Sequence, residues 1–416
     1  MCNEFEVRKL AMLLYHGQHL SKTEICQQVK RSRPWLDRWI DRYDPGDVDG
    51  SLQDHASGPN VGHGTWSIEI RQQVIEMRRM RSQDKQWRYA FLGAEAIHLE
   101  LEALHSPEAP PARTIHEWFV QAGLISHKTQ QPKDHVRKPI PLPKVDAVNR
   151  VQQMDLIGPI YLEGSGTKYY LIVLRDRYSH RCAIGVLEGR DARGIVEFLI
   201  ASWQSMGLPD YLQLDNALEF RGSNRYPRSF GRVVRVAVDL HVEPIFNPPH
   251  EPWRNGGVEW FNGFLRTHLL TVQFSDLTAF RDETQRCQDS CNQTHRLSDY
   301  GGLTPDELVA TANLRLPPPG YDRHQTSSLP QDQGSVSFVR LVRKSGRITL
   351  GAGDRFMVDP ELAHQYVLAR VDLAKRDVTI MHNGKKIRTY SFSPDTVGAW
   401  ANGNEDTGQL LDKPVT

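Results

Sequence analysis

The chain has 416 residues, 39% of them hydrophobic and 24% charged, which suffices for roughly two to four domains with separate cores. It contains no apolar run approaching the ~18 residues of a membrane-spanning helix, and its acidic start lacks the layout of a secretory signal. Five scattered cysteines argue against a disulfide framework and favour the reducing cytoplasm. The 51 basic and 50 acidic residues nearly cancel, so net charge alone does not indicate a polyanionic partner.

Basic residues gather locally, in the stretches 128–144, 221–235 and 340–347. One run of this kind is most often a solvated surface, but three runs in one chain weaken that interpretation. The local charge distribution therefore favours contact with nucleic acid at these segments.

Residues 1–54 are predicted to form three short helices. Apolar residues at helical spacing mark the first, a capping box at Ser21 opens the second, and Ser32 caps the third. Two short helices, a tight turn and a third helix bearing Arg33 and Arg38 are typical of a helix-turn-helix DNA-binding module. A generic three-helix bundle fits the same pattern.

A second helical unit is predicted over 65–127, after a linker rich in Gly, Pro, Asn and His. Its helices are expected at 67–82, 92–105 and 112–122. The last of them carries Arg113, so two tandem modules indicate a bipartite DNA-reading region. Residues 128–148 are basic and rich in proline, which predicts an extended, semi-rigid linker.

From about residue 149 the hydrophobic period changes from helical to strand-like. Strands are expected at 151–157, 169–174, 181–186, 211–214 and 242–246, with helices at 191–206, 259–270 and within 276–313. This order predicts an α/β domain over 149–315 with a central mixed five-stranded sheet and trailing helices.

Short β-type runs recur every eight to twelve residues over 333–394, which predicts a small β-barrel. The polar end, 395–416, is expected to be a flexible tail. The fold class is therefore multidomain, with all-α modules first, an α/β core next and a small barrel last.

Three acids are candidates for catalysis: Asp155 within the first strand of the core, Asp215 at the end of the fourth, and Glu259 in the first turn of a helix. If those strands are neighbours, both aspartates project at one sheet end. Clustered carboxylates repel unless a cation neutralises them, and oxygen ligands select Mg²⁺ or Mn²⁺. Two such ions can activate an attacking oxygen and stabilise a leaving oxygen in phosphoryl transfer.

Sequence motifs surround each acid. They are Gln153-Met154-Asp155, Asp215-Asn216-Ala217-Leu218-Glu219-Phe220, Pro248-Pro249-His250-Glu251-Pro252-Trp253-Arg254-Asn255-Gly256-Gly257-Val258-Glu259 and Asp299-Tyr300-Gly301-Gly302-Leu303-Thr304-Pro305. With these motifs, residues 149–310 resemble the catalytic core of retroviral-integrase-like DDE transposases of bacterial insertion sequences. The resemblance implies an RNase H-like fold and cut-and-join chemistry on DNA ends.

Two glutamates compete for the place of the third acid. Glu251 has the commoner family spacing from Asp215, but it lies between Pro249 and Pro252, where no stable helix can form. Glu259 follows the Asn-Gly pair and begins an amphipathic helix, so we assign the role to Glu259. The longer spacing is explained if the arginine-rich stretch 221–235 is an inserted or extended loop.

Further residues are expected to contact DNA or to order the catalytic loop. Arg266 lies seven residues after Glu259 on the same helix face, where the family places a basic residue; an ordinary surface arginine is the alternative. For Asn255, a helix cap is the alternative role. Ala217 replaces the usual Gly of the family, and His180 stands where Arg is common. The remaining expected contacts are Asn216, Arg221, Arg225, Arg228, Arg340, Arg343, Lys344 and Arg347.

The resulting hypothesis is an insertion-sequence transposase that binds terminal inverted repeats of double-stranded DNA through its N-terminal modules and joins the cut ends to target DNA. Asp155, Asp215 and Glu259 would hold two Mg²⁺ (or Mn²⁺) ions, with Asp155 bridging both. A homo-oligomer assembled on DNA is expected, with no membrane partner. No phosphate-binding GxxxxGK[ST] motif occurs, so no nucleotide cofactor is implied.

Two other functions fit parts of the pattern. A domesticated, non-catalytic DNA-binding regulator would keep the helix-turn-helix but has no need of the acids. An RNase H-like structure-specific nuclease would use the acids but not the end-binding modules or the barrel.

Overall fold

The computed structural model describes residues 4–54, 66–104, 109–125, 138–222, 228–251, 254, 256–321, 332–350 and 354–394. The chain divides into two compact units, Met1–Ser67 and Ile68–Thr416. Of the helices in these ranges, none is long and apolar enough to cross a membrane.

The first unit is a bundle of short helices around one apolar core. Its helices are α1 (Glu4–Met12), continued by the π-helical turn η1 (Leu13–Gly17), α2 (Lys22–Val29), α3 (Arg33–Arg42) and α4 (Val48–Ser51). The predicted capping box is confirmed, because the Ser21 hydroxyl accepts from the Glu24 amide and the Glu24 carboxylate accepts from the Ser21 amide. The Ser32 side chain, in contrast, makes no capping hydrogen bond, so that part of the prediction is wrong. Pro34 lies in the first turn of α3, where proline favours the start of a helix.

The second helical segment belongs to the larger unit. It comprises α5 (Ile68–Gln83), the short η2 (Lys85–Trp87), α6 (Ala94–Ala103) and α7 (Ala112–Gln121). The Tyr89 hydroxyl donates to Glu283 Oε1 over 2.6 Å, and the Phe91 ring stacks on Phe264 with centroids 4.7 Å apart. Residues 89–91 therefore attach this segment to the α/β core.

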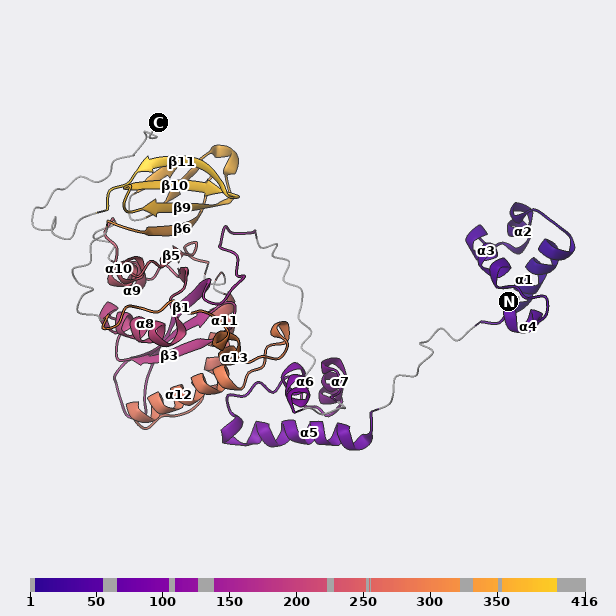
Figure 1. Ribbon diagram of the computed structural model, residues 1–416, viewed down its shortest axis with the longest axis horizontal. Coiled ribbons are helices and arrows are strands. Elements are labelled where there is room, and N and C mark those ends of the chain that lie inside the picture. The colour runs from indigo at the N-terminus through magenta and orange to yellow at the C-terminus, as the bar shows by residue number, and fades with distance from the viewer. Residues whose placement is uncertain are drawn as a thin grey trace, which may run out of the picture. The chain divides into compact units, whose positions relative to one another are not determined.

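Five strands of the core occur in the predicted order: β1 (Val151–Ile160), β2 (Tyr169–Asp176), β3 (Cys182–Leu187), β4 (Tyr211–Leu214) and β5 (Glu243–Phe246). In space they lie in the order β3-β2-β1-β4-β5 (Figure 1). β1 to β3 are antiparallel, whereas β4 is parallel to β1 and β5 to β4. This mixed arrangement is the one expected for an integrase-core-like fold.

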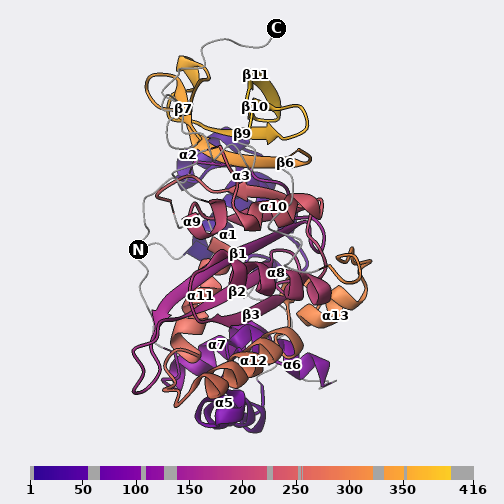
Figure 2. The same ribbon diagram turned by 90° about the vertical axis from the view of Figure 1, so that its left-hand side faces the viewer.

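Alternate residues of the strands enter two separate cores, as the two-residue period of a sheet requires. Ile172 and Leu174 pack with α8 (Ala192–Met206) and α10 (Arg232–Asp239). Leu171 and Val173 pack with α11 (Gly256–His268) and α12 (Leu277–Gln293) on the opposite face. Figure 2 shows these helices beside the strands.

The stretch 221–235 is not simply an inserted loop. The short α9 (Leu218–Arg221) precedes it, and α10 begins inside it. α10 has buried valines on the side that faces the sheet and is therefore an amphipathic helix. The arginines in this stretch led to its prediction as a loop.

The predicted C-terminal barrel is not found as a closed sheet. The strands are β6 (Ser335–Leu341), β7 (Arg347–Thr349), β8 (Arg355–Met357), β9 (Tyr366–Asp372), β10 (Asp377–His382) and β11 (Lys385–Ser391), with the turn η6 (Pro360–Leu362) between β8 and β9. β6 pairs with β5 in parallel, so β6, β9, β10 and β11 extend the core to a nine-stranded sheet, and β7–β8 form a separate pair (Figures 1 and 2). Exposed strand edges favour such pairing, which sequence period alone does not reveal.

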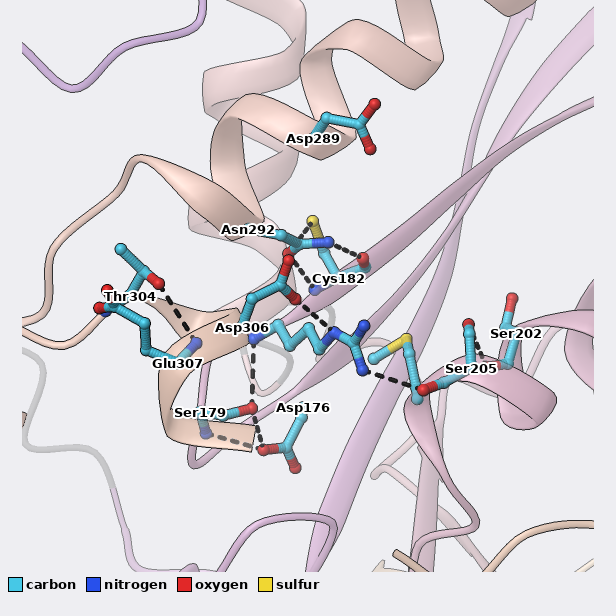
Figure 3. Close-up of polar contacts among 12 residues, drawn as sticks. Asp176, Ser179, Cys182, Ser202, Ser205, Asp289, Asn292, Thr304, Asp306 and Glu307 are labelled. Carbon is cyan, nitrogen blue, oxygen red and sulfur yellow. Dashed lines mark hydrogen bonds and ion pairs between the residues drawn. The ribbon is translucent and has the colours of Figure 1, made fainter. Parts of the chain in front are cut away.

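The helices that follow α11 contact the sheet at its β3 edge through hydrogen bonds and an ion pair. The Asn292 side chain on α12 accepts from the Cys182 amide and donates to the Cys182 carbonyl, over 2.9 and 2.8 Å (Figure 3). The 3₁₀ turn η4 (Ser298–Tyr300) and α13 (Pro305–Ala310) follow, and Asp306 forms an ion pair with Arg181 at 2.8 Å. At the same end, Asp176 accepts from the Ser179 amide and hydroxyl.

Candidate active site

The two candidate aspartates occupy equivalent places on neighbouring parallel strands. Gln153 of β1 is paired with Gln213 of β4, and each aspartate follows two residues later. Asp155 and Asp215 therefore lie on the same face of the sheet as the two glutamines, the face covered by α11.

A chain of buried amides joins that face to the start of α11. The Val258 amide donates to Gln153 Oε1 over 3.1 Å, Gln153 Nε2 donates to Gln213 Oε1 over 3.0 Å, and Gln213 Nε2 donates to Asn247 Oδ1 over 2.8 Å. We call Gln153, Gln213 and Asn247 the amide chain. A Cβ on Gly257 would lie 2.7 Å from Gln153 Oε1, so glycine is required for this close approach. The amide chain thereby places α11, and Glu259 in its first turn, beside β1 and β4.

Asp155 is also held directly by α11. Its Oδ2 accepts from Asn262 Nδ2 over 2.7 Å, and its Oδ1 accepts from the Leu156 amide over 2.9 Å. Asp215 Oδ1 accepts from the Ala217 amide over 2.9 Å.

The electrostatics indicate that the three acids lie near one another. Burial and, to a smaller extent, the negative charges of Asp215 and Glu259 together raise the pKa of Asp155 to about 6, against the lowering effect of its hydrogen bonds. Burial also raises the pKa of Asp215, and the charge of Glu219 adds to that rise. Yet among the described residues no three His, Cys, Asp or Glu side chains converge closely enough to form a metal-binding group.

Glu251, the competing third acid, is engaged elsewhere. Its carboxylate accepts from Arg254 Nε over 2.9 Å and from the hydroxyl of Tyr366 on β9. The Arg254 guanidinium also lies over the Tyr366 ring, 4.9 Å from the centroid. Glu251 thus joins the loop before α11 to the C-terminal strands.

Arg340, an expected DNA contact, is buried with only 4% of its surface exposed. Its Nη2 donates to Asn216 Oδ1 over 3.0 Å and its Nη1 to the Asn247 carbonyl over 3.2 Å. Asn216 Nδ2 donates to the same Asn247 carbonyl over 2.6 Å. The expectation of DNA contact is therefore corrected for Arg340, which lies inside the protein because β6 joins the core sheet.

The other expected DNA contacts divide by exposure. The exposed side chains are Arg33, Arg38, Arg113, Arg266, Arg343 and Lys344, whereas Arg221 and Arg347 are half-buried. Arg228 forms an ion pair with Asp354 at 2.8 Å, which is not the free surface position expected. Arg225 and Asn255 lie outside the described residues.

A groove of about 910 Å³ opens beside Glu259. One wall is α11, and the other is the segment 78–93, which comprises the end of α5 and the connection to α6. Basic side chains on that wall outnumber the single acid Asp84 there: Arg78, Arg81, Lys85 and Arg88.

The amide chain and Asn262 were not predicted from the sequence. A signal was present, because Gln153-Met154-Asp155 and Gln213-Leu214-Asp215 share the spacing Gln-x-Asp on two strands. Only the pairing of β1 with β4 shows that the two glutamines touch.

Residues 3–52 match the family model of a homeodomain-like domain. A comparison of the whole chain with curated proteins found no match.

Among solved structures, the chain is similar to retroviral integrases. The HTLV-2 integrase catalytic core in complex with magnesium shares 18% identity, over 40% of this chain and 99% of that one, with a TM-score of 0.31. The simian T-cell lymphotropic virus intasome shares 16% sequence identity, and the match covers 60% of this chain and 78% of that one with a TM-score of 0.33. The catalytic core of BIV integrase shares 19% sequence identity, and the match covers 39% of this chain and 94% of that one with a TM-score of 0.31.

Proposed function

We propose that the chain is a DDE transposase that cuts the ends of an insertion sequence and joins them to target DNA. The single observation that carries the proposal is the placement of Asp155 and Asp215 at matched positions on parallel strands, with Glu259 on a helix hydrogen-bonded to the first of these strands. Three carboxylates on one face of a mixed sheet suit metal-dependent phosphoryl transfer.

Asp155, Asp215 and Glu259 are the residues that would hold Mg²⁺ or Mn²⁺. Their oxygen-only donor set fits a hard cation, and the pKa of Asp155 is raised first by burial and then by the negative charges of Asp215 and Glu259, charges that a cation would neutralise. Bound metal would supply an activated oxygen nucleophile and stabilise the leaving oxygen. We propose two ions, although the three carboxylates must draw closer than they lie in this conformation.

The chain's own residues orient these acids. Asn262 fixes the carboxylate of Asp155, the Ala217 amide fixes that of Asp215, and the amide chain sets the approach of α11. Glu251 is a weaker candidate for the third acid because Arg254 and Tyr366 occupy its carboxylate.

DNA recognition would begin at the homeodomain-like residues 3–52, where Arg33 and Arg38 are exposed on α3. We propose that the second helical module, with Arg113, also reads the terminal inverted repeats. The groove beside Glu259 and the exposed Arg266 would hold phosphates of the terminal DNA.

The domain boundaries 1–54, 65–127, 128–148, 149–315, 333–394 and 395–416 stay part of this proposal. Two transposon ends must be cut and joined together, so we propose a homo-oligomer assembled on DNA in the bacterial cytoplasm, near the nucleoid. Target DNA would contact the exposed Arg343 and Lys344 and the half-buried Arg347.

The test uses purified full-length protein, Mg²⁺ and a labelled duplex with the inverted repeats that flank the coding sequence. We expect a 3′-hydroxyl at the transposon end, followed by strand-transfer products. Asp215→Asn should lower both by about 100-fold or more, because the variant removes one metal ligand. Equal products from Asp215→Asn and wild type would refute the catalytic assignment. Cleavage without strand transfer would favour the nuclease, and DNA binding without either product would favour the regulator.

A further inference from the structure

The guanidinium of Arg340 makes five hydrogen bonds inside the protein. Besides Asn216 Oδ1 and the Asn247 carbonyl, it donates to the carbonyls of Thr349, Val339 and Leu350, over 3.0, 2.9 and 3.4 Å. A guanidinium has five N–H donors, so these hydrogen bonds use its whole capacity.

All five acceptors are neutral oxygens, which is unusual for a buried cation. Burial lowers the pKa of Arg340 to about 9, and the nearby Arg221 contributes to the decrease. Arg340 is therefore still protonated at neutral pH. An aliphatic side chain of β6 could hold the strand in place without the cost of desolvating a charge.

The hydrogen bonds lead from Arg340 to the catalytic loop. Asn216 follows Asp215 directly, and its side chain is held on one side by Arg340 and on the other by the Asn247 carbonyl. Asn247 is also the last member of the amide chain. Arg340 thus reaches the turn between β4 and α9 from a strand 124 residues away in sequence.

We propose that Arg340 is a positioning residue that fixes the Asp215–Asn216 turn, so that the C-terminal segment completes the active site instead of serving only as a DNA-binding module. This inference rests on the proposed function. It assigns Arg340 to the catalytic step and the exposed Arg343, three residues later, to DNA affinity.

The test compares Arg340→Met, Arg340→Lys and Asn216→Ala with the matched control Arg343→Met, in the full-length protein. Arg340→Met should lower kcat for end cleavage roughly 10–100-fold, as loss of a residue that orients a metal ligand does, and leave DNA affinity within about 2-fold. Arg340→Lys should restore part of the rate. Arg343→Met should weaken DNA binding, which is the effect that Arg340→Met is expected not to have.

A double-mutant cycle separates positioning from general support of the fold. If Arg340 acts through Asn216, Arg340→Lys should have much less effect in the Asn216→Ala background than in wild type. Independent, multiplying effects would overturn the proposal. So would a rate loss that follows only the loss of folded protein, measured by thermal unfolding. If Arg340→Met does not fold, Arg340→Lys and Asn216→Ala still decide the question.

Hydrogen exchange gives a readout that does not need activity. The Ala217 amide donates to Asp215 Oδ1, so its protection reports the order of the turn. It should exchange at least about 10-fold faster in Arg340→Lys than in wild type, while amides of β2 are unchanged. An unchanged Ala217 amide would refute the positioning role. If wild type cleaves no DNA but this amide responds, the proposed function fails and the positioning role stands.

Discussion

Gln153 on β1 donates a hydrogen bond to Gln213 on β4 over 3.0 Å and accepts one from the Val258 amide at the start of α11. Both glutamine side chains are essentially buried. This pair of side chains links the two strands that carry the aspartates to the helix that carries Glu259.

We expect Gln153→Leu to destabilise the protein by about 1–3 kcal/mol, because it leaves the Val258 amide and the Gln213 side chain unsatisfied in the interior. Denaturant unfolding would measure the loss. The exposed Gln285→Leu on α12 is the control and should change the free energy of unfolding by less than about 0.5 kcal/mol. Similar losses for both variants would show that the amide chain does not determine stability.

Glu259 and Glu251 should respond differently to the same substitution. Glu259→Gln is expected to reduce cleavage by about 100-fold or more, since it removes a proposed metal ligand. Glu251→Gln is expected to lower stability by about 1–2 kcal/mol, because it weakens the hydrogen bonds with Arg254 and Tyr366, but to keep most activity in folded protein. Cleavage assays paired with thermal unfolding separate the two effects, and the reverse pattern would assign the third acid to Glu251.

Removal of the Tyr89 hydroxyl should weaken the attachment of the second helical segment to the core. Tyr89→Phe removes the hydrogen bond to Glu283 and leaves a half-buried carboxylate with fewer partners, at a cost of about 1–2 kcal/mol. Limited proteolysis should therefore cleave the chain between α7 and the core faster in Tyr89→Phe than in wild type. The exposed Tyr161→Phe is the control, and an effect of equal size there would show that the Tyr89 hydroxyl has no special part in the attachment.

Acid should destabilise the fold through His295. Burial lowers its pKa to about 4, so between pH 6.5 and 4 the unfolded chain binds a proton that the folded chain does not. Stability therefore falls as the pH falls through this window, by about 1 kcal/mol at pH 5.5 relative to pH 7.5. Denaturant unfolding of His295→Gln should show a smaller decrease over the same range, whereas an identical decrease would place the acid sensitivity elsewhere.

Salt dependence of DNA binding tests the exposed cations of the C-terminal strands. Replacing Arg343 or Lys344 by Ala should reduce the slope of log Kd against log salt by about 0.9 for each phosphate that the side chain neutralises. Titrations with unrelated duplexes should show the same change, because binding to phosphate does not read sequence. Arg281→Ala on α12 should leave the slope unchanged; if all three variants share one slope, these side chains do not bind DNA.

The amino-acid sequence alone predicted the local elements and the candidate acids. Periodicity marked the five core strands, the capping box at Ser21 marked α2, and Glu259 was preferred to Glu251 because prolines exclude a helix around Glu251. These features depend on neighbours in sequence, so the chain reveals them directly.

Tertiary structure decided which distant groups touch. Short β-type runs predicted a closed barrel, but the free edge of β5 pairs with β6 and draws Arg340 into the interior. The hydrogen bonds of Gln153 with Gln213 and of Asn262 with Asp155 likewise depend on strand order and helix packing. Contacts between residues far apart in sequence depend on burial and on the need of buried polar groups for hydrogen-bond partners in the whole fold. A local sequence pattern therefore does not predict them.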